Sequence, residues 1–118
     1  MSDELKRTGE ARQFETGAQR DSGEGKLKMS LMPLEPLKRV QKRYLDGANE
    51  YGANNWTKGM PISELYDSAN RHMQDFWEGK TDEDHLAAAA WNIFGLMWTI
   101  SNKPELDDRK KGFPNAIT

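Results

Sequence analysis

Residues 81–102, TDEDHLAAAAWNIFGLMWTISN, decide the fold. Thr81 is the predicted N-cap of a helix, and Asp84 three residues later completes a variant of the capping box. The helix should end near Asn102, because Pro104 cannot continue it. The most apolar helix of the chain therefore lies in this range.

This helix carries apolar side chains on nearly every face, and a small monomeric bundle cannot bury all of them. Residues 87–90 are four alanines, which allow another helix to approach closely. We therefore expect the chain to form a homo-oligomer. The large apolar residues are Leu86, Trp91, Ile93, Phe94, Leu96, Met97, Trp98 and Ile100.

Two amphipathic helices precede this segment. Apolar residues recur at steps of three and four after Pro33, and Gly52 is the predicted stop. A second pattern begins near Ser63, a predicted N-cap, and ends at Gly79. The pattern predicts an all-α fold, a small antiparallel helical bundle. The inner stripes are Leu37, Val40, Tyr44, Ala48 and Tyr51 in the first helix and Leu65, Ala69, His72, Met73 and Phe76 in the second.

The ends of the chain lack helical periodicity. Residues 1–30 are mostly small, polar or charged and predict a flexible or extended N-terminal arm. Residues 31–103 form the predicted helical domain, and residues 104–118 form a C-terminal tail. Within the helical domain, residues 52–61 (GANNWTKGMP) are rich in turn formers and hydrogen-bond donors, so we expect an ordered loop there.

Composition limits the classes of function. The 118 residues include 17 basic and 19 acidic residues, and a net charge of −2 argues against general charge neutralisation of nucleic acid. Cysteine is absent, so any metal must bind carboxylate, histidine or amide groups, which favours Mg²⁺ or Mn²⁺. The first ten residues lack an apolar targeting segment, and the longest apolar stretch is too short to span a bilayer. We expect a cytoplasmic protein.

A polar and small-residue seam runs along the third helix. His85, Ala88, Asn92, Gly95 and Thr99 follow one another at steps of three and four residues, so they share one face. The seam either fixes the register of the helix or lines a pocket. In the second case the acidic residues 82–84 lie at its mouth, although acids at a helix start also complement the helix dipole.

The first two helices offer pairs of carboxylates. Asp75 and Glu78 are three residues apart, and Asp46 and Glu50 are four apart, so each pair shares a helix face. Such pairs are often solvated surface. On two facing helices, however, they would provide the hard oxygens that divalent ions need to bridge phosphates. His72 lies on the apolar face of its helix as either a core residue or a ligand.

The loop also offers a possible base-binding group. Asn54, Asn55, Trp56 and Lys58 place an indole ring beside amide and ammonium groups, a combination suited to stacking a base and contacting its edge or phosphates. The alternative is that the indole is a hydrophobic plug.

The order of several short motifs resembles a known family. These motifs are FETGAQRD (14–21), EGK (24–26), GANEYGANNWTKGMP (47–61), DSANRH (67–72) and DEDHLAAAAWN (82–92). Together they resemble the phage dATP/dGTP diphosphohydrolases, a small branch of the all-α, MazG-like nucleoside triphosphate pyrophosphohydrolases. The resemblance covers about residues 14–100.

The resemblance implies that the helical domain is catalytic and assembles into dimers or tetramers. It implies that a purine deoxynucleoside triphosphate is cleaved between its α and β phosphates to give the monophosphate and pyrophosphate, with Mg²⁺ or Mn²⁺ held on helix-borne carboxylates. We expect catalytic roles for Asp82, Asp84 and His85. The expected metal ligands are Glu50, Asp82 and Asp84, with Asp75 and Glu78 in reserve. The expected substrate-binding residues are Lys26, Tyr51, Asn55, Trp56, Lys58, Arg71, His72 and Asn92.

A competing hypothesis is that the chain is a non-enzymatic phage module with a nucleic-acid-binding or regulatory role. It depends on the basic stripe Lys38, Arg39, Lys42 and Arg43, with Trp56 nearby in the sequence. This hypothesis predicts salt-sensitive binding to polynucleotide without a metal requirement. Such a charge run is also typical of a solvated helix face.

Overall fold

The structure is a computed structural model that describes residues 10–109. The chain divides into two compact units, residues 1–32 and residues 33–118, which are described separately. Parts of the expected N-terminal arm and C-terminal tail, residues 1–9 and 110–118, lie outside the described residues.

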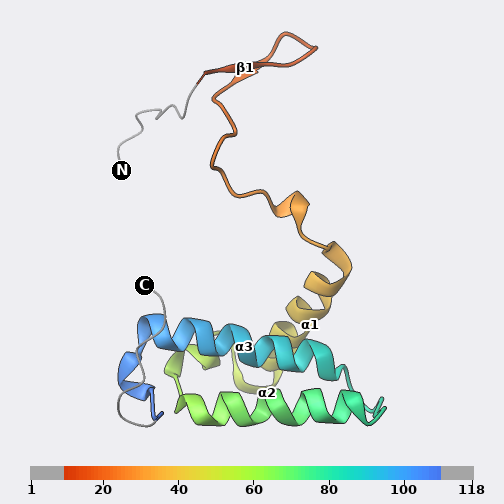
Figure 1. The fold of residues 1–118 in the computed structure, drawn as a ribbon, viewed down its shortest axis with the longest axis vertical. Helices are drawn as coiled ribbons and strands as arrows, with labels where there is room; N and C mark the ends of the chain where they lie inside the picture. The colour runs from red at the N-terminus through yellow and green to blue at the C-terminus, as the bar shows by residue number, and fades with distance from the viewer. Residues whose placement is uncertain (1–9, 110–118) are drawn as a thin grey trace. The chain divides into compact units, whose positions relative to one another are not determined.

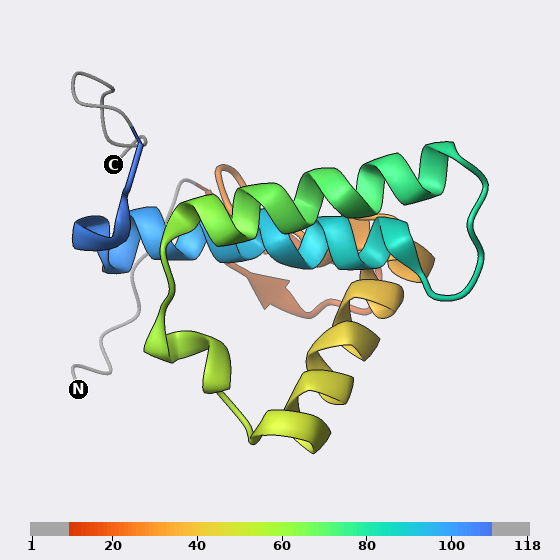
Figure 2. The same ribbon diagram turned by 90° about the horizontal axis from the view of Figure 1, so that it is seen from below.

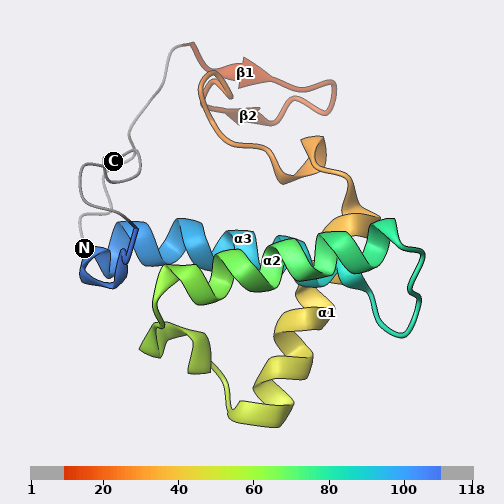
Figure 3. The same cartoon turned by 60° about the horizontal axis from the view of Figure 1, so that its bottom comes forward.

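The first unit contains a small β-hairpin, labelled in Figure 3. Strands β1 (Arg12–Gln13) and β2 (Gln19–Arg20) are antiparallel, with Arg12 opposite Arg20. Their turn is closed by a hydrogen bond from the Phe14 amide to the Ala18 carbonyl (2.8 Å), and Gly17 adopts a φ of 91°. A 3-10 turn, η1 (Met29–Leu31), follows. The expectation of an all-α chain is therefore corrected: the protein is mostly helical, with a hairpin too short to produce a sequence periodicity.

The second unit contains three α-helices (Figure 1): α1 (Leu34–Tyr51), α2 (Ile62–Trp77) and α3 (His85–Asn102). A 3-10 turn, η2 (Asn55–Lys58), lies between α1 and α2, and another, η3 (Pro104–Leu106), follows α3. Helices α2 and α3 run antiparallel side by side, and α1 packs against α3 (Figure 2). No helix in residues 10–109 combines the length and apolar character that a membrane crossing requires.

Helix α3 begins later than the sequence suggested. Asp84 is its N-cap and accepts a hydrogen bond from the Ala87 amide at 3.1 Å, so the prediction that Thr81 is the N-cap was wrong. The physical reason is tertiary: Arg39 of α1 binds the Asp84 carboxylate and holds it at the helix start. The predicted end at Asn102 is confirmed, as is the end of α1 before Gly52.

Helix α2 also has a start that local sequence did not predict. It begins at Ile62, so Ser63 is not its N-cap. Instead, the Ser63 amide donates a 3.0 Å hydrogen bond to Asp108, beyond the end of α3. Lys103 donates to the Lys58 carbonyl at 3.3 Å. Residues 103–108 are thus attached to the beginning of α2 and the end of the loop before it.

The core lies between α2 and α3. Leu65 and Ala69 are buried as predicted, together with Ile62 of α2 and Ala87, Ala88 and Ala89 of α3. A Cβ on Gly95 would lie 3.2 Å from Leu65 Cδ2, so the small residue permits this close packing. The prediction that the α3 seam shares one face is confirmed, since His85, Ala88, Asn92 and Thr99 are buried and Gly95 is partly buried.

Several predicted core residues are exposed. Tyr51 is 69% exposed, and Met73 and Phe76 are nearly half exposed, so their placement in the inner stripes was wrong. The three helices bury only a narrow apolar strip where they pack together. Residues near the helix ends lie outside this strip and stay exposed to solvent. On α3, Ile93 and Met97 are also exposed. This agrees with the expectation that a single chain cannot bury a helix that is apolar on nearly every face.

Candidate functional site

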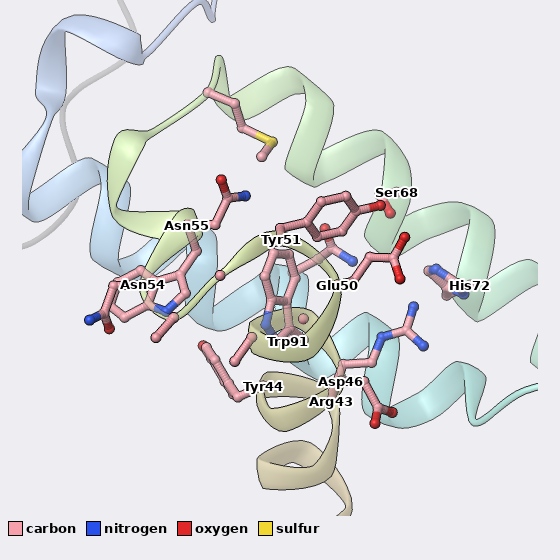
Figure 4. A pocket seen from close by; sticks show the side chains of 17 residues that line it. Arg43, Tyr44, Asp46, Glu50, Tyr51, Asn54, Asn55, Ser68, His72 and Trp91 are labelled. Atoms are coloured by element: carbon pink, nitrogen blue, oxygen red, sulfur yellow. The ribbon is translucent and has the colours of Figure 1, made fainter.

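A pocket of about 880 Å³ opens within the helical unit, between α1, the following loop, α2 and α3. Figure 4 shows that its two ends differ in chemistry. Asn54 and Asn55 lie at one end, while Arg43, Glu50 and His72 gather at the other. The pocket therefore joins an amide-bearing end to a charged end.

The loop that closes the pocket is fixed by its backbone. Asn54 adopts a left-handed φ of 64°, and its carbonyl accepts hydrogen bonds from the Thr57 amide (3.0 Å) and hydroxyl (2.6 Å). Gly59 then adopts a φ of 83°. These turns direct Asn55 and Trp56 back toward the helices, where both line the pocket.

An aromatic cluster contributes Tyr44, Trp56 and Trp91 to the pocket lining. Trp56 packs edge-on against Tyr44 (centroids 6.1 Å apart) and Trp98 (5.1 Å apart). Tyr44 also contacts Trp91, with centroids 5.8 Å apart. Burial raises the pKa of the Tyr44 hydroxyl. Trp56 therefore has two roles: it packs against Tyr44 and Trp98, and it lines the pocket.

Ion pairs organise the charged end. Arg43 Nη1 lies 2.9 Å from Glu83 Oε1, which links α1 to the residues before α3. Asp46 is paired with Lys42 one turn earlier on α1. Glu50 lines the pocket, and Figure 4 shows its side chain directed toward His72.

A second ion pair joins α1 to the start of α3. Arg39 donates two hydrogen bonds of 2.7 Å to the two oxygens of Asp84. The Arg39 guanidinium lowers the pKa of Asp84 to about 2, and the carboxylate in turn raises the pKa of Arg39. Asp84 thus has a structural role as helix cap and ion-pair partner.

The two histidines of the chain meet beside this point. His72 Nδ1 and His85 Nδ1 are 3.0 Å apart, and His85 Nε2 lies 2.8 Å from Asp82 Oδ1. Because an ionised carboxylate only accepts, we assign the proton to His85 Nε2, and His72 Nδ1 then donates to His85 Nδ1. Burial lowers the pKa of His72, and the bond to His85 lowers the pKa of Asp82.

The structure gathers some of the expected site residues and separates others. Six of them line the pocket: Glu50, Tyr51, Asn55, Trp56, His72 and Asn92. Asp82, Asp84 and His85 lie together at the start of α3, outside the pocket lining, in the contacts described above.

The remaining expected residues lie elsewhere. Asp75 binds Lys80 at 3.0 Å and Glu78 lies 3.5 Å from the same ammonium, which places both at the end of α2. Lys58 and Arg71 are exposed and do not line the pocket. Lys26 belongs to the first unit of the chain.

Sequence reasoning missed Arg43 and Glu83 as a pair. Arg39 and Arg43 are four residues apart on one face of α1, and Glu83 and Asp84 are adjacent acids. This complementary spacing was the available signal, but pairing it required knowing that α1 packs on α3. The same contacts weaken the competing hypothesis, because three cations of the basic stripe, Arg39, Lys42 and Arg43, are ion-paired within the chain.

Comparison with known proteins points to one family. The family model described as "dATP/dGTP diphosphohydrolase, N-terminal" matches residues 16–109. The chain is also 30% identical over 92 residues to a dATP/dGTP diphosphohydrolase of Salmonella phage PMBT28. That match covers 74% of this chain and 31% of the phage protein, so the chain spans about a third of its relative's length. No solved structure matches the chain.

Proposed function

Since the chain belongs to the dATP/dGTP diphosphohydrolase N-terminal family, we propose that it binds a purine deoxynucleoside triphosphate and cleaves it between the α and β phosphates. The products are the deoxynucleoside monophosphate and pyrophosphate. The family name supports the substrate class, and the pocket supports a nucleotide-sized ligand with one aromatic and one anionic part.

The two-ended pocket is the observation that carries this proposal. A purine fits the end formed by the loop, where the exposed Tyr51 and half-buried Trp56 offer ring faces and Asn55 offers an amide. Bases stack on such rings and are recognised at their edges by amide groups. The triphosphate then extends toward Arg43 and His72.

Carboxylates in the pocket suit a hard divalent cation. Glu50 lines the charged end, and Asp46 lies four residues earlier on the same face of α1. We propose these two as the first ligands of Mg²⁺ or Mn²⁺, which prefer such oxygens, and Asp46 would leave its ion pair with Lys42 to bind the ion. A bound ion would offset the charge of the triphosphate and supply an activated water.

The remaining acids have a supporting place in this proposal. Asp82 is bonded to His85, and Asp84 is bonded to Arg39. Each acid could bind an ion only after it leaves its partner. Asp75 and Glu78 are reserve ligands that would have to leave Lys80. Lys58 and Arg71 stay proposed phosphate contacts, but both are exposed outside the pocket lining, and each side chain would have to move to reach the triphosphate.

We also propose a MazG-like homo-oligomer, a dimer or tetramer. The support is the apolar outer side of α3, where Ile93 is 46%, Phe94 41% and Met97 64% exposed. A face of this kind on a small chain is typical of an interface. Trp91 and Trp98 are engaged partly within their own chain.

The test is a hydrolysis screen of all dNTPs and NTPs with Mg²⁺ or Mn²⁺, with pyrophosphate and orthophosphate measured separately. We expect dATP or dGTP to release pyrophosphate and no orthophosphate. Orthophosphate release would place the cleavage at another bond. If no nucleotide is hydrolysed or bound, while polynucleotide binds in a salt-sensitive manner, the competing hypothesis of a non-enzymatic module is supported.

A further inference from the structure

We propose that His72, Glu83 and His85 form a second metal site, for a divalent transition-metal ion of the Zn²⁺ or Co²⁺ type. The three side chains come from α2, the connection before α3 and the first residue of α3. One potential ligand atom of each lies within 4.8 Å of the others. This site is distinct from the carboxylate pair proposed for Mg²⁺ or Mn²⁺, since two of its three ligands are nitrogen.

The distance between the imidazoles suits a shared ion. Zinc binds histidine nitrogen at about 2.0–2.1 Å with tetrahedral angles, so two such ligands lie about 3.3 Å apart. The observed separation of His72 Nδ1 and His85 Nδ1 is 3.0 Å. A small opening of the pair would admit the ion once the proton on His72 Nδ1 is released to water and His72 takes the tautomer protonated at Nε2.

The outer contact of His85 has the form found in metal centres. A metal-binding histidine usually donates its other ring N–H to a carboxylate, which fixes the ring and its tautomer. His85 is 4% exposed and its Nε2 lies 2.8 Å from Asp82 Oδ1. This contact leaves the lone pair of His85 Nδ1 directed toward His72, where the ion would be bound.

Oxygen ligands can complete the set. Glu83 is exposed and needs only a side-chain movement, and Asp75 Oδ2 lies 3.9 Å from His85 Nδ1. A mixture of imidazole and carboxylate favours zinc-like ions over Mg²⁺. Glu83 is paired with Arg43, so the ion and the guanidinium compete for the same carboxylate.

The site can be tested without any nucleotide. Untagged full chain is titrated with Co²⁺, followed by visible absorption, and with Zn²⁺ and Mg²⁺, followed by calorimetry. We expect Co²⁺ and Zn²⁺ to bind more tightly than Mg²⁺. Since the chain has only two histidines, NMR of the imidazole nitrogens can report both rings, and Zn²⁺ should shift Nδ1 of each. Imidazole nitrogens that do not shift when Zn²⁺ is added would overturn the proposal, whereas Mg²⁺ binding that leaves both rings unshifted belongs to the carboxylate pair of α1.

Variants then test the individual ligands. His72→Ala and Glu83→Gln should each weaken Co²⁺ binding by at least about tenfold, while Glu64→Gln, an exposed acid in the first turn of α2, should not. Arg43→Gln should strengthen binding, because it removes the competitor for Glu83. Unchanged Co²⁺ affinity in both His72→Ala and Glu83→Gln would refute the site. Hydrolysis with Mg²⁺, measured separately, tests the proposed function independently.

Discussion

Arg39 and Asp84 lie 45 positions apart in the chain and form a two-point ion pair that joins α1 to the start of α3. The same Asp84 oxygen that binds Arg39 Nη2 also accepts from the Ala87 amide. The Asp84 side chain therefore caps α3 and also binds Arg39 of α1. These two contacts together fix the start of α3 at His85.

This relationship predicts a loss of stability in acid. Arg39 lowers the pKa of Asp84 from 3.8 to about 2 in the folded chain. The folded state therefore binds this proton less readily than the unfolded state. The resulting stabilisation is complete above about pH 4 and disappears as the pH falls through 2. Denaturant unfolding at pH 6 and pH 3 measures it.

Two substitutions separate the charge of Asp84 from its capping role. Asp84→Asn keeps a capping oxygen and should remove the pH dependence assigned to this residue. Asp84→Ala also loses the cap and should cost about 1 kcal/mol more. Equal stability of the two variants at pH 6 would show that the cap contributes nothing.

Two glycines predict opposite effects of the same substitution. Gly59 has a φ of 83°, and a Cβ there would lie 2.6 Å from Leu106 Cδ1, so Gly59→Ala should destabilise the fold by at least about 1 kcal/mol. Gly47 lies within α1 with nothing within 4 Å of its added Cβ. Gly47→Ala should therefore stabilise by up to about 1 kcal/mol. Thermal unfolding measures both, and a stabilising Gly59→Ala would contradict the packing of η3 on the loop.

The exposed side of α3 predicts the oligomeric state. Light scattering should report a dimer or larger species. Met97→Glu should shift it toward a monomer, because a charge would then be buried in the interface. Tyr66→Glu, on an exposed position of α2, is the control and should leave the assembly unchanged. A 13.5 kDa monomer of the unmodified chain at micromolar concentration would refute the interface.

Local sequence was sufficient for three of the helix ends. Pro33, Gly52 and Pro104 act on the neighbouring backbone, so their effect needs no knowledge of packing. The start of α3 could not be derived in this way, because Arg39 selects Asp84 from across the fold. The β1–β2 hairpin was missed because two-residue strands leave no alternation to detect.

The candidate site also contains residues that the sequence could show and pairs that it could not. The pocket residues Tyr51, Asn55 and Trp56 lie within six consecutive positions, so the sequence alone showed them as one motif. The pairs His72–His85 and Arg43–Glu83 were not, because each partner alone looks like an ordinary helix residue. Their chemistry appears only when the helices are packed.

The carboxylate pair of α1 predicts a metal-dependent reaction. Hydrolysis should stop with EDTA and return with Mg²⁺ or Mn²⁺. Glu50→Gln should lower kcat by orders of magnitude, because an anionic ligand is lost while the fold is kept. Glu64→Gln is the matched control. If Asp82→Asn or Asp84→Asn abolishes turnover while Glu50→Gln does not, the ion is bound at the start of α3 instead.

Trp56 predicts how the base is bound. If the indole stacks on a purine, Trp56→Ala should remove about 1 to 3 kcal/mol of interaction, or about 5- to 150-fold in affinity. The loss should appear in KM with little change in kcat, because the stack serves substrate and transition state alike. Lys58→Ala should instead weaken all triphosphates equally, since an ammonium does not distinguish bases.

The packing of Trp56 requires a control for stability. Its ring contacts Tyr44 and Trp98, so Trp56→Ala should also lower the unfolding temperature. Trp56→Phe keeps a ring in the cluster and should recover more stability than affinity, because the smaller ring stacks less of the purine. Trp77→Ala, at an 83% exposed position, should change neither property. A Trp56→Ala protein with lowered stability but unchanged KM would show that the indole is a hydrophobic plug, and the base would then have to bind along the seam at Asn92.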